Sequence, residues 1–329
     1  MANSAKTTAA LLLTLLSGSG CQSQNNKPME NNPLLCNPEK GLCEIPGTPT
    51  QNSTTAVQAV EKPIKVVYFT DPICSSCWGI EPQLRKLKLE YGQSIDIEYR
   101  MGGLLPDWSY NSGGISKPSD VAHHWDEVSA YYDMPIDGDV WLEDPLDSSY
   151  PPSIAFKAAQ LQDQQKALLF LREIREMVFL QKKNIAKRDN LALAARKVGL
   201  DITQFKTDFE GRAKLLFEED LKLGRAMGVR GFPTMIFSNT DGKNATVYGS
   251  KPYGDYEQAI KSLHPLAAKA TYDQNWQAVF AKYTTLTARE FAELTQTPRA
   301  NAEKTLNELT ANGALEKQTT KNGSIWKRR

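Results

Sequence analysis

Residues 71–78 read Asp-Pro-Ile-Cys-Ser-Ser-Cys-Trp and place two cysteines, Cys74 and Cys77, at the spacing CxxC. Before them lies a β-branched and aromatic run, Ile64–Thr70, of the kind that forms a buried strand. After them, apolar residues recur at helical spacing over residues 78–91. At such a strand-to-helix junction, unpaired backbone N–H groups and the helix dipole stabilise a thiolate at Cys74. Cys77 lies one helical turn later, within reach of a mixed disulfide on Cys74.

The chain that follows predicts a small sheet divided by a large block of helices. The alternating run Ser94–Met101 is a second strand, and a strand, a helix and a strand in that order favour a parallel pair. Residues 102–151 are rich in Gly, Pro and Ser and predict a loop, whereas residues 152–227 have a helical pattern almost throughout. Strand signals return at Thr234–Phe237, and Asp241-Gly242 predicts a hairpin turn after them.

Two prolines complete the pattern around the CxxC. Pro82 lies five residues after the second cysteine, inside the predicted helix, where it kinks the backbone. Pro233 directly precedes the returning strand in a Gly-Phe-Pro-Thr sequence. This combination of strand, CxxC, proline-kinked helix, helical insertion and Gly-x-Pro-Thr resembles the thioredoxin superfamily, specifically its DsbA-like branch. The resemblance covers about residues 63–265 and implies an α/β thioredoxin fold with a large helical insertion at about residues 105–227.

The chemistry of the CxxC and the resemblance together assign the candidate site residues. We expect Cys74 to be the nucleophile and Cys77 the resolving thiol. The resemblance implies that Pro233 is a cis proline, packs beside the active disulfide and orients the substrate. Its neighbours Phe232 and Thr234 then belong to the same substrate loop.

Asp71 and the CxxC each leave a second interpretation open. Asp71 is a candidate proton acceptor near Cys77, but an Asp at such a position more often caps a helix or turn. A CxxC is also half of a zinc site, yet a structural zinc needs four ligands and the sequence has no second CxxC or CxxH. With three His in the whole chain, we expect no metal and no cofactor.

The residues around the CxxC narrow the resemblance. The Asp-Pro-x-Cys-x-x-Cys-Trp sequence, followed by Glu81-Pro-Gln-Leu84, looks most like the FrnE-type proteins and the SpxH (YjbH) adaptor group. Ser75-Ser76 stands where the oxidase prototype has Pro-His, so the direction of electron flow stays open. The related kappa-class glutathione transferases and chromene-carboxylate isomerases use a Ser nucleophile, and the two cysteines argue against that function.

The N-terminus resembles an export signal. Small residues follow the short apolar run Thr7–Leu16 and lead to Cys21, as in a bacterial lipoprotein signal. Ordinary export and a cytoplasmic tail are the alternatives. Residues 1–20 therefore predict a signal peptide with Cys21 as the lipidation site. Residues 21–62, rich in Asn, Pro, Thr and Gln, predict a flexible tether.

The tether carries a second pair of cysteines. Cys36 and Cys43 bracket Asn37-Pro-Glu-Lys-Gly-Leu42, a segment whose composition favours a tight turn. We expect them to form a second redox pair that exchanges with Cys74, because the flexible linker Glu44–Pro63 has the reach to bring them there. A local disulfide staple is the alternative.

Residues 270–329 predict a separate module. Thr287-Ala-Arg-Glu290 is a capping box that opens one helix, and Thr297-Pro298 opens a second. Asn322-Gly323 then predicts a tight hairpin, so the order helix, helix, hairpin resembles a winged helix. The second helix has balanced charge, unlike a DNA-reading helix. We therefore expect a protein-docking or packing module.

The leading hypothesis is an exported enzyme: a thiol:disulfide oxidoreductase of the cell envelope, oxidase or isomerase. It would act on protein thiols and disulfides, exchange electrons with an unidentified redox partner and meet the membrane only through a lipid anchor. The net charge of +1 gives no whole-protein attraction to nucleic acid. The alternative is an SpxH-like cytoplasmic adaptor that presents a redox regulator to an ATP-dependent protease.

Overall fold

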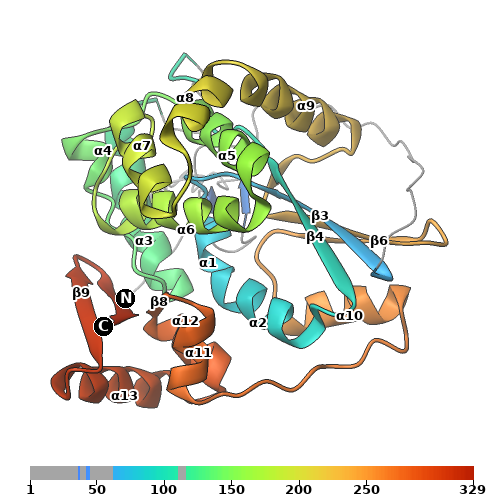
Figure 1. Cartoon of the computed structure of the whole chain (residues 1–329), viewed down its shortest axis with the longest axis vertical. Helices are drawn as coiled ribbons and strands as arrows, with labels where there is room; N and C mark the ends of the chain where they lie inside the picture. The colour runs from blue at the N-terminus through green and yellow to red at the C-terminus, as the bar shows by residue number, and fades with distance from the viewer. Residues whose placement is uncertain (1–35, 38–41, 45–61, 110–115) are drawn as a thin grey trace, which may run out of the picture.

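The computed structural model describes residues 36–37, 42–44, 62–109 and 116–329. Its centre is a four-stranded sheet in the order β4-β3-β6-β7 (Figure 1). The strands are β3 (Ile64–Thr70), β4 (Ile95–Met101), β6 (Thr234–Asn239) and β7 (Asn244–Tyr248). β3 pairs in parallel with β4 and antiparallel with β6, and β6 pairs antiparallel with β7.

The burial of each strand follows its sequence pattern. β3 lies in the middle of the sheet, and all its residues except Lys65 are buried. β4 is an edge strand, and it buries Ile95, Tyr99 and Met101 while Asp96 is exposed. A central strand is covered on both faces and an edge strand can leave one face in water, which explains the apolar run in one and the alternation in the other.

The predicted single helix after the CxxC is in fact two helices. α1 (Ser75–Gly79) ends at Ile80, and α2 (Glu81–Tyr91) begins immediately after it. Pro82 therefore lies in the first turn of α2, where its missing N–H has no intrahelical partner to lose. The proline opens a new helix here and does not kink a continuous one.

Within the predicted insertion, helices begin earlier than the helical pattern of residues 152–227 indicates. The composition of residues 102–151 predicts a loop, but they contain the 15-residue helix α3 (Pro118–Tyr132). Its first turn has Pro118 and Asp120, and its buried face includes Val121, Trp125 and Val128 at helical spacing. The Gly- and Pro-rich flanks mask this signal. The remaining insertion helices are α4 (Val140–Glu143), α5 (Tyr150–Gln162), α6 (Gln164–Leu180), α7 (Arg188–Lys197), α8 (Ile202–Glu210) and α9 (Arg212–Ala226).

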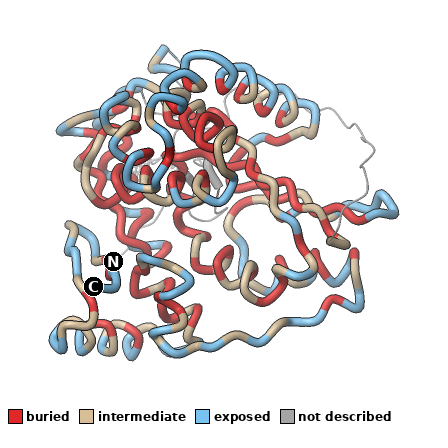
Figure 2. Tube along the Cα trace, in the orientation of Figure 1, coloured by how far each residue is buried: buried red, intermediate tan, exposed pale blue. Residues whose placement is uncertain are grey.

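Helices cover the sheet from two sides. Figure 1 shows the insertion helices gathered on one side of the strands, with α2 and α10 (Tyr253–Leu263) on the other. α9 lies against β4, and α10 lies against β6 and β7. The buried segments run through the sheet and the inner faces of these helices (Figure 2), so the sheet and the insertion share one apolar core.

The C-terminal module has its own core. It consists of α11 (Trp276–Lys282), β8 (Thr285–Thr287), α12 (Ala288–Thr295), α13 (Arg299–Ala311), β9 (Leu315–Thr320) and β10 (Gly323–Arg328). The predicted capping box is present, because the Thr287 and Glu290 side chains each bond the other residue's backbone N–H. A separate cluster including Leu286, Leu306 and Trp326 fills the interior of the module.

A buried ion cluster joins this module to the thioredoxin-like part. Glu290 of α12 is fully buried and accepts two hydrogen bonds from Arg172 of α6, at 2.8 and 3.0 Å. Arg85 of α2 lies 3.2 Å from the same carboxylate and also donates to the Thr285 carbonyl. The Glu290 carboxylate therefore binds two guanidinium groups, which come from α2 and α6 of the thioredoxin-like part.

A second, small sheet lies beside the central one. β5 (Gly231–Phe232) pairs antiparallel with β2 (Leu42–Glu44), which in turn pairs with β1 (Cys36–Asn37). The remaining N-terminal residues, Cys21 among them, lie outside the described part of the chain. The predicted thioredoxin fold with a helical insertion is confirmed.

The ion cluster predicts a large stability difference between two neighbouring glutamates. Glu290→Ala breaks the buried ion pairs with Arg85 and Arg172, which keep only Glu81 and Glu176 as acidic partners among the described residues, so we expect the free energy of unfolding to fall by about 3–5 kcal/mol. Glu293→Ala removes a more exposed pair with Lys86 and should cost less than about 1 kcal/mol. Urea unfolding of both variants measures the difference, and equal losses would contradict the cluster's role.

Candidate functional site

The CxxC lies at the start of α1, in the interior of the protein. Cys74 is the N-cap residue of α1, and its Sγ accepts a hydrogen bond from the Cys77 backbone N–H at 3.1 Å. Both cysteines are thiols and neither side chain has any exposed surface. The junction is therefore where the sequence predicts it, but it is closed to solvent.

Aromatic side chains from the insertion cover the CxxC. The Tyr132 hydroxyl donates to the Ser76 Oγ at 2.9 Å. Trp78 stacks on Phe179 with ring centroids 5.4 Å apart, and its Nε1 donates to the Pro135 carbonyl at 3.1 Å. These contacts hold α1 against α3 and α6, so the dipeptide between the cysteines belongs to the packed core.

The predicted substrate loop is tightly packed. The Phe232–Pro233 peptide bond is cis, and the Thr234 hydroxyl donates to the Gly231 carbonyl at 2.7 Å. Phe232 is fully buried and lies where a Cβ on Gly102 would stand, 1.6 Å from the ring. Glycine at position 102 is therefore required for this ring to reach its site.

Asp71 holds the loops around the CxxC together. Its Oδ1 accepts from the Ile73 N–H at 3.0 Å, and its Oδ2 accepts from the Leu104 N–H at 2.8 Å and the Ser149 hydroxyl at 2.9 Å. Burial raises the pKa of Asp71 to about 6, against the opposing effect of these hydrogen bonds. This arrangement fits the capping interpretation of Asp71, since both oxygens are used to fix backbone.

The two thiols differ in acidity, and the order is the reverse of the expected one. Burial raises the pKa of Cys74 well above its usual value. Burial also acts to raise that of Cys77, but the hydrogen bond from Cys74 and the charge of Arg175 outweigh it and lower the pKa of Cys77. The helix N-terminus alone would favour a thiolate at Cys74. At Cys74 desolvation dominates, because the thiol has no exposed surface.

Arg175 connects the thiols to the ion cluster, and the sequence analysis did not find it. Its guanidinium donates to the Thr70 hydroxyl at 2.6 Å and to Glu81 at 2.7 Å. Arg172, one turn earlier on α6, lies with its guanidinium 4.3 Å from the centroid of the Trp78 ring and binds Glu290. Both arginines lie in the predicted helical region at i and i+3, a spacing that puts their two charges in one stripe along α6. That stripe was the available signal.

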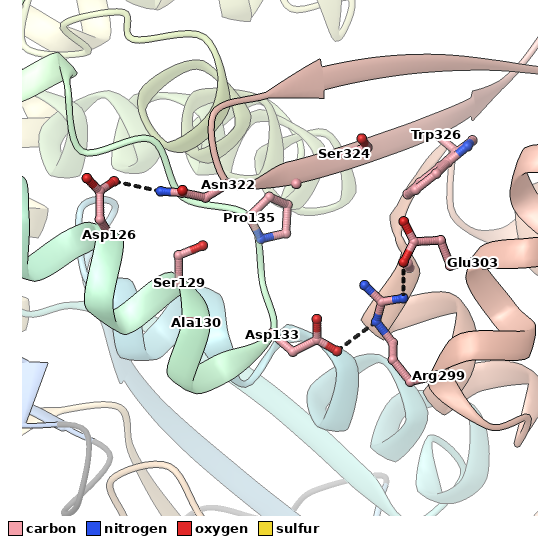
Figure 3. A pocket seen from close by; sticks show the side chains of 12 residues that line it. Asp126, Ser129, Ala130, Asp133, Pro135, Arg299, Glu303, Asn322, Ser324 and Trp326 are labelled. Atoms are coloured by element: carbon pink, nitrogen blue, oxygen red, sulfur yellow. Dashed lines mark hydrogen bonds and ion pairs between the residues drawn. The ribbon is translucent and has the colours of Figure 1, made fainter.

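A cleft lies between α3 and the C-terminal module. Figure 3 shows its lining, with Asp133 and Glu303 both bound to Arg299 and with Asn322 reaching Asp126. The cavity has a volume of about 220 Å³. A larger one of about 550 Å³ is lined by residues of α2, β4 and α6, Arg85 and Arg172 of the ion cluster among them. Neither cavity is lined by the CxxC or by the loop at Pro233.

The comparisons with known proteins decide the family. A sequence model of the thioredoxin family matches residues 68–258. The ClpXP adapter protein SpxH of Halalkalibacterium halodurans is 36% identical over 303 residues, which cover 90% of this chain and 97% of that protein. The chain belongs to the SpxH family. SpxH of Bacillus subtilis (strain 168) is 29% identical over 272 residues, covering 81% of this chain and 90% of that protein.

A solved structure supports the fold alone. A putative protein disulfide isomerase from Nitrosomonas europaea superposes with a TM-score of 0.52 at 21% identity, covering 62% of this chain and 96% of the other. Such a similarity carries the thioredoxin architecture but not an activity.

The SpxH relatives correct the functional hypothesis. The expected exported, lipid-anchored thiol:disulfide oxidoreductase of the cell envelope is wrong, as are its expected thiol substrates, redox partner and membrane anchor, because the relatives are named as adapters of a protease. The CxxC and the fold are common to enzymes and adapters, so neither could separate them. No helix in the described part of the chain is long and apolar enough to cross a membrane.

The second redox pair, Cys36 and Cys43, remains a prediction. Cys36 and Cys43 are cross-strand partners in the β1–β2 pair, and their exchange with Cys74 is untested. The proposed lipidation site, Cys21, lies outside the described residues. Within the described ranges, no group of three His, Cys, Asp or Glu side chains is placed to hold a metal ion.

The raised pKa of Asp71 predicts a pH-dependent cost of folding. A carboxyl group whose pKa rises from 3.8 to about 6 on folding favours the native state below pH 4 and loses that contribution as the pH rises through 6. Relative to Asp71→Asn, the wild-type free energy of unfolding should fall by about 2–2.5 kcal/mol between pH 4 and pH 7. Urea unfolding of both proteins across that range gives the difference, and a constant difference would contradict a shifted Asp71.

Proposed function

We propose that the chain is an adapter that binds a protein substrate and presents it to the ATP-dependent protease ClpXP. The observation that carries this proposal is the 36% identity to a ClpXP adapter protein SpxH over 90% of this chain and 97% of the relative. Because the similarity spans both the thioredoxin-like part and the C-terminal module, it concerns the whole arrangement and not only the fold. The proposal places the chain in the cytoplasm with its protease.

The burial of the CxxC and the raised pKa of Cys74 support a role in which the thiols do not react. A catalytic cysteine of this fold has a lowered pKa and an accessible sulfur, whereas buried structural cysteines are inert. Cys74 has neither property, since it is fully buried and its pKa is raised. We therefore propose that Cys74 and Cys77 serve as packing residues, and that Phe232, Pro233 and Thr234 shape the adjoining edge.

The rigid connection between the two units supports a presenting role. An adapter has to hold one protein while it meets another, so its binding surfaces need a fixed relative position. Glu290 fixes α12 to α2 and α6, and Arg299 and Asn322 fix the module to α3 from a second side. Two separate attachments prevent the module from rotating about either one.

Protein half-lives in cells test this function. In cells that lack this chain, we expect a set of proteins to be degraded several-fold more slowly, and we expect the same proteins to be stabilised in cells that lack ClpX. Pulsed isotope labelling with mass spectrometry measures the half-lives. Two sets without a common member would contradict an adapter of this protease.

A thiol-free variant separates the adapter from an enzyme. Because the thiols are buried packing groups, Cys74→Ser with Cys77→Ser should restore the wild-type half-lives of these proteins when it is expressed at the wild-type level. Glu290→Ala is the control that should fail to restore these half-lives, since it keeps both thiols but weakens the attachment of the C-terminal module. Restoration by Glu290→Ala but not by the thiol-free variant would overturn the proposal.

A further inference from the structure

An N-terminal hairpin occupies the edge of the loop that precedes Pro233. In the backbone register, Cys43 of β2 stands opposite Phe232, and Glu44 stands opposite Gly231. β1 then pairs with the outer side of β2, with Cys36 opposite Cys43. A segment far from this loop in the sequence thus supplies its strand partner.

The same hairpin meets the helix that carries the CxxC. β2 lies against α1, the helix that Cys74 caps and that contains Cys77. Leu42–Glu44 therefore pairs with the β5 edge and also contacts α1. Both cysteine side chains are completely buried in this arrangement.

We propose that the β1–β2 hairpin is an intramolecular strap, which fills the strand-docking edge at Gly231–Phe232 and shields the CxxC from solvent. The exposed backbone of a strand edge binds an extended segment by strand addition, and here the bound segment belongs to the chain itself. An extended segment of another protein has to displace Leu42–Glu44 before it can pair with β5. The inference goes beyond the adapter function and does not depend on it.

The cysteines of the hairpin make the strap sensitive to oxidation. Directly opposed residues of an antiparallel pair have Cα atoms about 4.5–5.5 Å apart, which is within the range that a disulfide spans. A small-molecule disulfide such as oxidised glutathione takes up two electrons and two protons from Cys36 and Cys43. One S–S bond then forms across the hairpin while the S–S bond of the oxidant breaks, which releases two reduced thiols.

The Cys36–Cys43 disulfide would join two strands that are already paired in the docked hairpin. A cross-strand disulfide reduces the freedom of the undocked segment, so it favours the paired state. Oxidation therefore closes the edge at Gly231–Phe232, and reduction lets the strap open more often. The proposed role of the Cys36–Cys43 disulfide is therefore to keep the strap docked under oxidising conditions.

Proline substitutions test whether the strap is where the structure places it. Neighbouring residues of a strand direct their N–H groups to opposite sides, so Cys43→Pro and Glu44→Pro between them remove a hydrogen bond to β5. Under dithiothreitol, at least one of them should speed alkylation of Cys74 by iodoacetamide and hydrogen exchange at whichever of Gly231 and Phe232 has its N–H facing β2, each by about tenfold or more.

Two matched controls belong to this experiment. Gln51→Pro places a proline outside the described strands, and Cys43→Ser removes the thiol but keeps the backbone N–H. Both should behave as the reduced wild-type protein, and exchange within β3 should stay slow in every variant, which shows that the core is folded. If both strand prolines leave exchange at 231–232 and alkylation of Cys74 unchanged, the strap is refuted.

A second measurement tests the redox step. In a Cys74→Ser, Cys77→Ser background, oxidised glutathione should slow hydrogen exchange at Gly231 and Phe232 several-fold relative to dithiothreitol. Adding Cys36→Ser should abolish that difference. Equal exchange under both conditions, with the Cys36–Cys43 disulfide verified by peptide mapping, would overturn the redox sensitivity.

Discussion

The carboxylate of Glu290 is the contact on which the arrangement of the two units depends. It is fully buried and is bound by guanidinium groups from α2 and α6. Isolated buried charges are costly, and this one is tolerated because both partners come with it. Its position in the first turn of α12 also completes the capping box with Thr287. Formation of the helix and docking of the module therefore rely on the same side chain.

The cluster continues from this interface to the CxxC. Arg172 lies over Trp78, and Arg175 binds Glu81 and the Thr70 hydroxyl at the end of β3. A single helix, α6, thus carries the groups that touch the module and those that line the thiols. Trp78 and Tyr132 pack α1 against the neighbouring helices of the insertion. The CxxC motif is present, but its two thiols have no exposed surface.

Local patterns predicted the parts of the fold that local forces decide. The burial of β3, the alternation in β4 and the Thr287–Glu290 capping box follow from the sequence because each depends on near neighbours. The hairpin predicted at Asn322-Gly323 is also present, with its turn one residue earlier, at Lys321-Asn322. α3 was missed because glycines and prolines flank it. The break at Ile80 was missed because a proline in a first turn and a proline in a kink look alike in sequence.

The position of the CxxC was predicted correctly, but the burial and acidity of its thiols were not. Cys74 and Cys77 lie at the expected strand-to-helix junction, whereas the acidity of Cys74 is set by burial under side chains from the insertion, which no spacing reveals. The pairing of Cys43 with Phe232 joins segments nearly two hundred residues apart and is equally invisible to local pattern. A motif shared by enzymes and adapters led to the wrong function for the same reason.

Reconstituted proteolysis tests the central claim most directly. Purified ClpXP is combined with a protein stabilised in cells lacking the chain, with and without the purified chain, and the degradation rate is measured. The account predicts faster degradation with the wild-type chain, an equal rate with Cys74→Ser and Cys77→Ser combined, and a reduced one with Glu290→Ala. No acceleration by the wild-type chain, or acceleration that disappears with the two thiols, would contradict it.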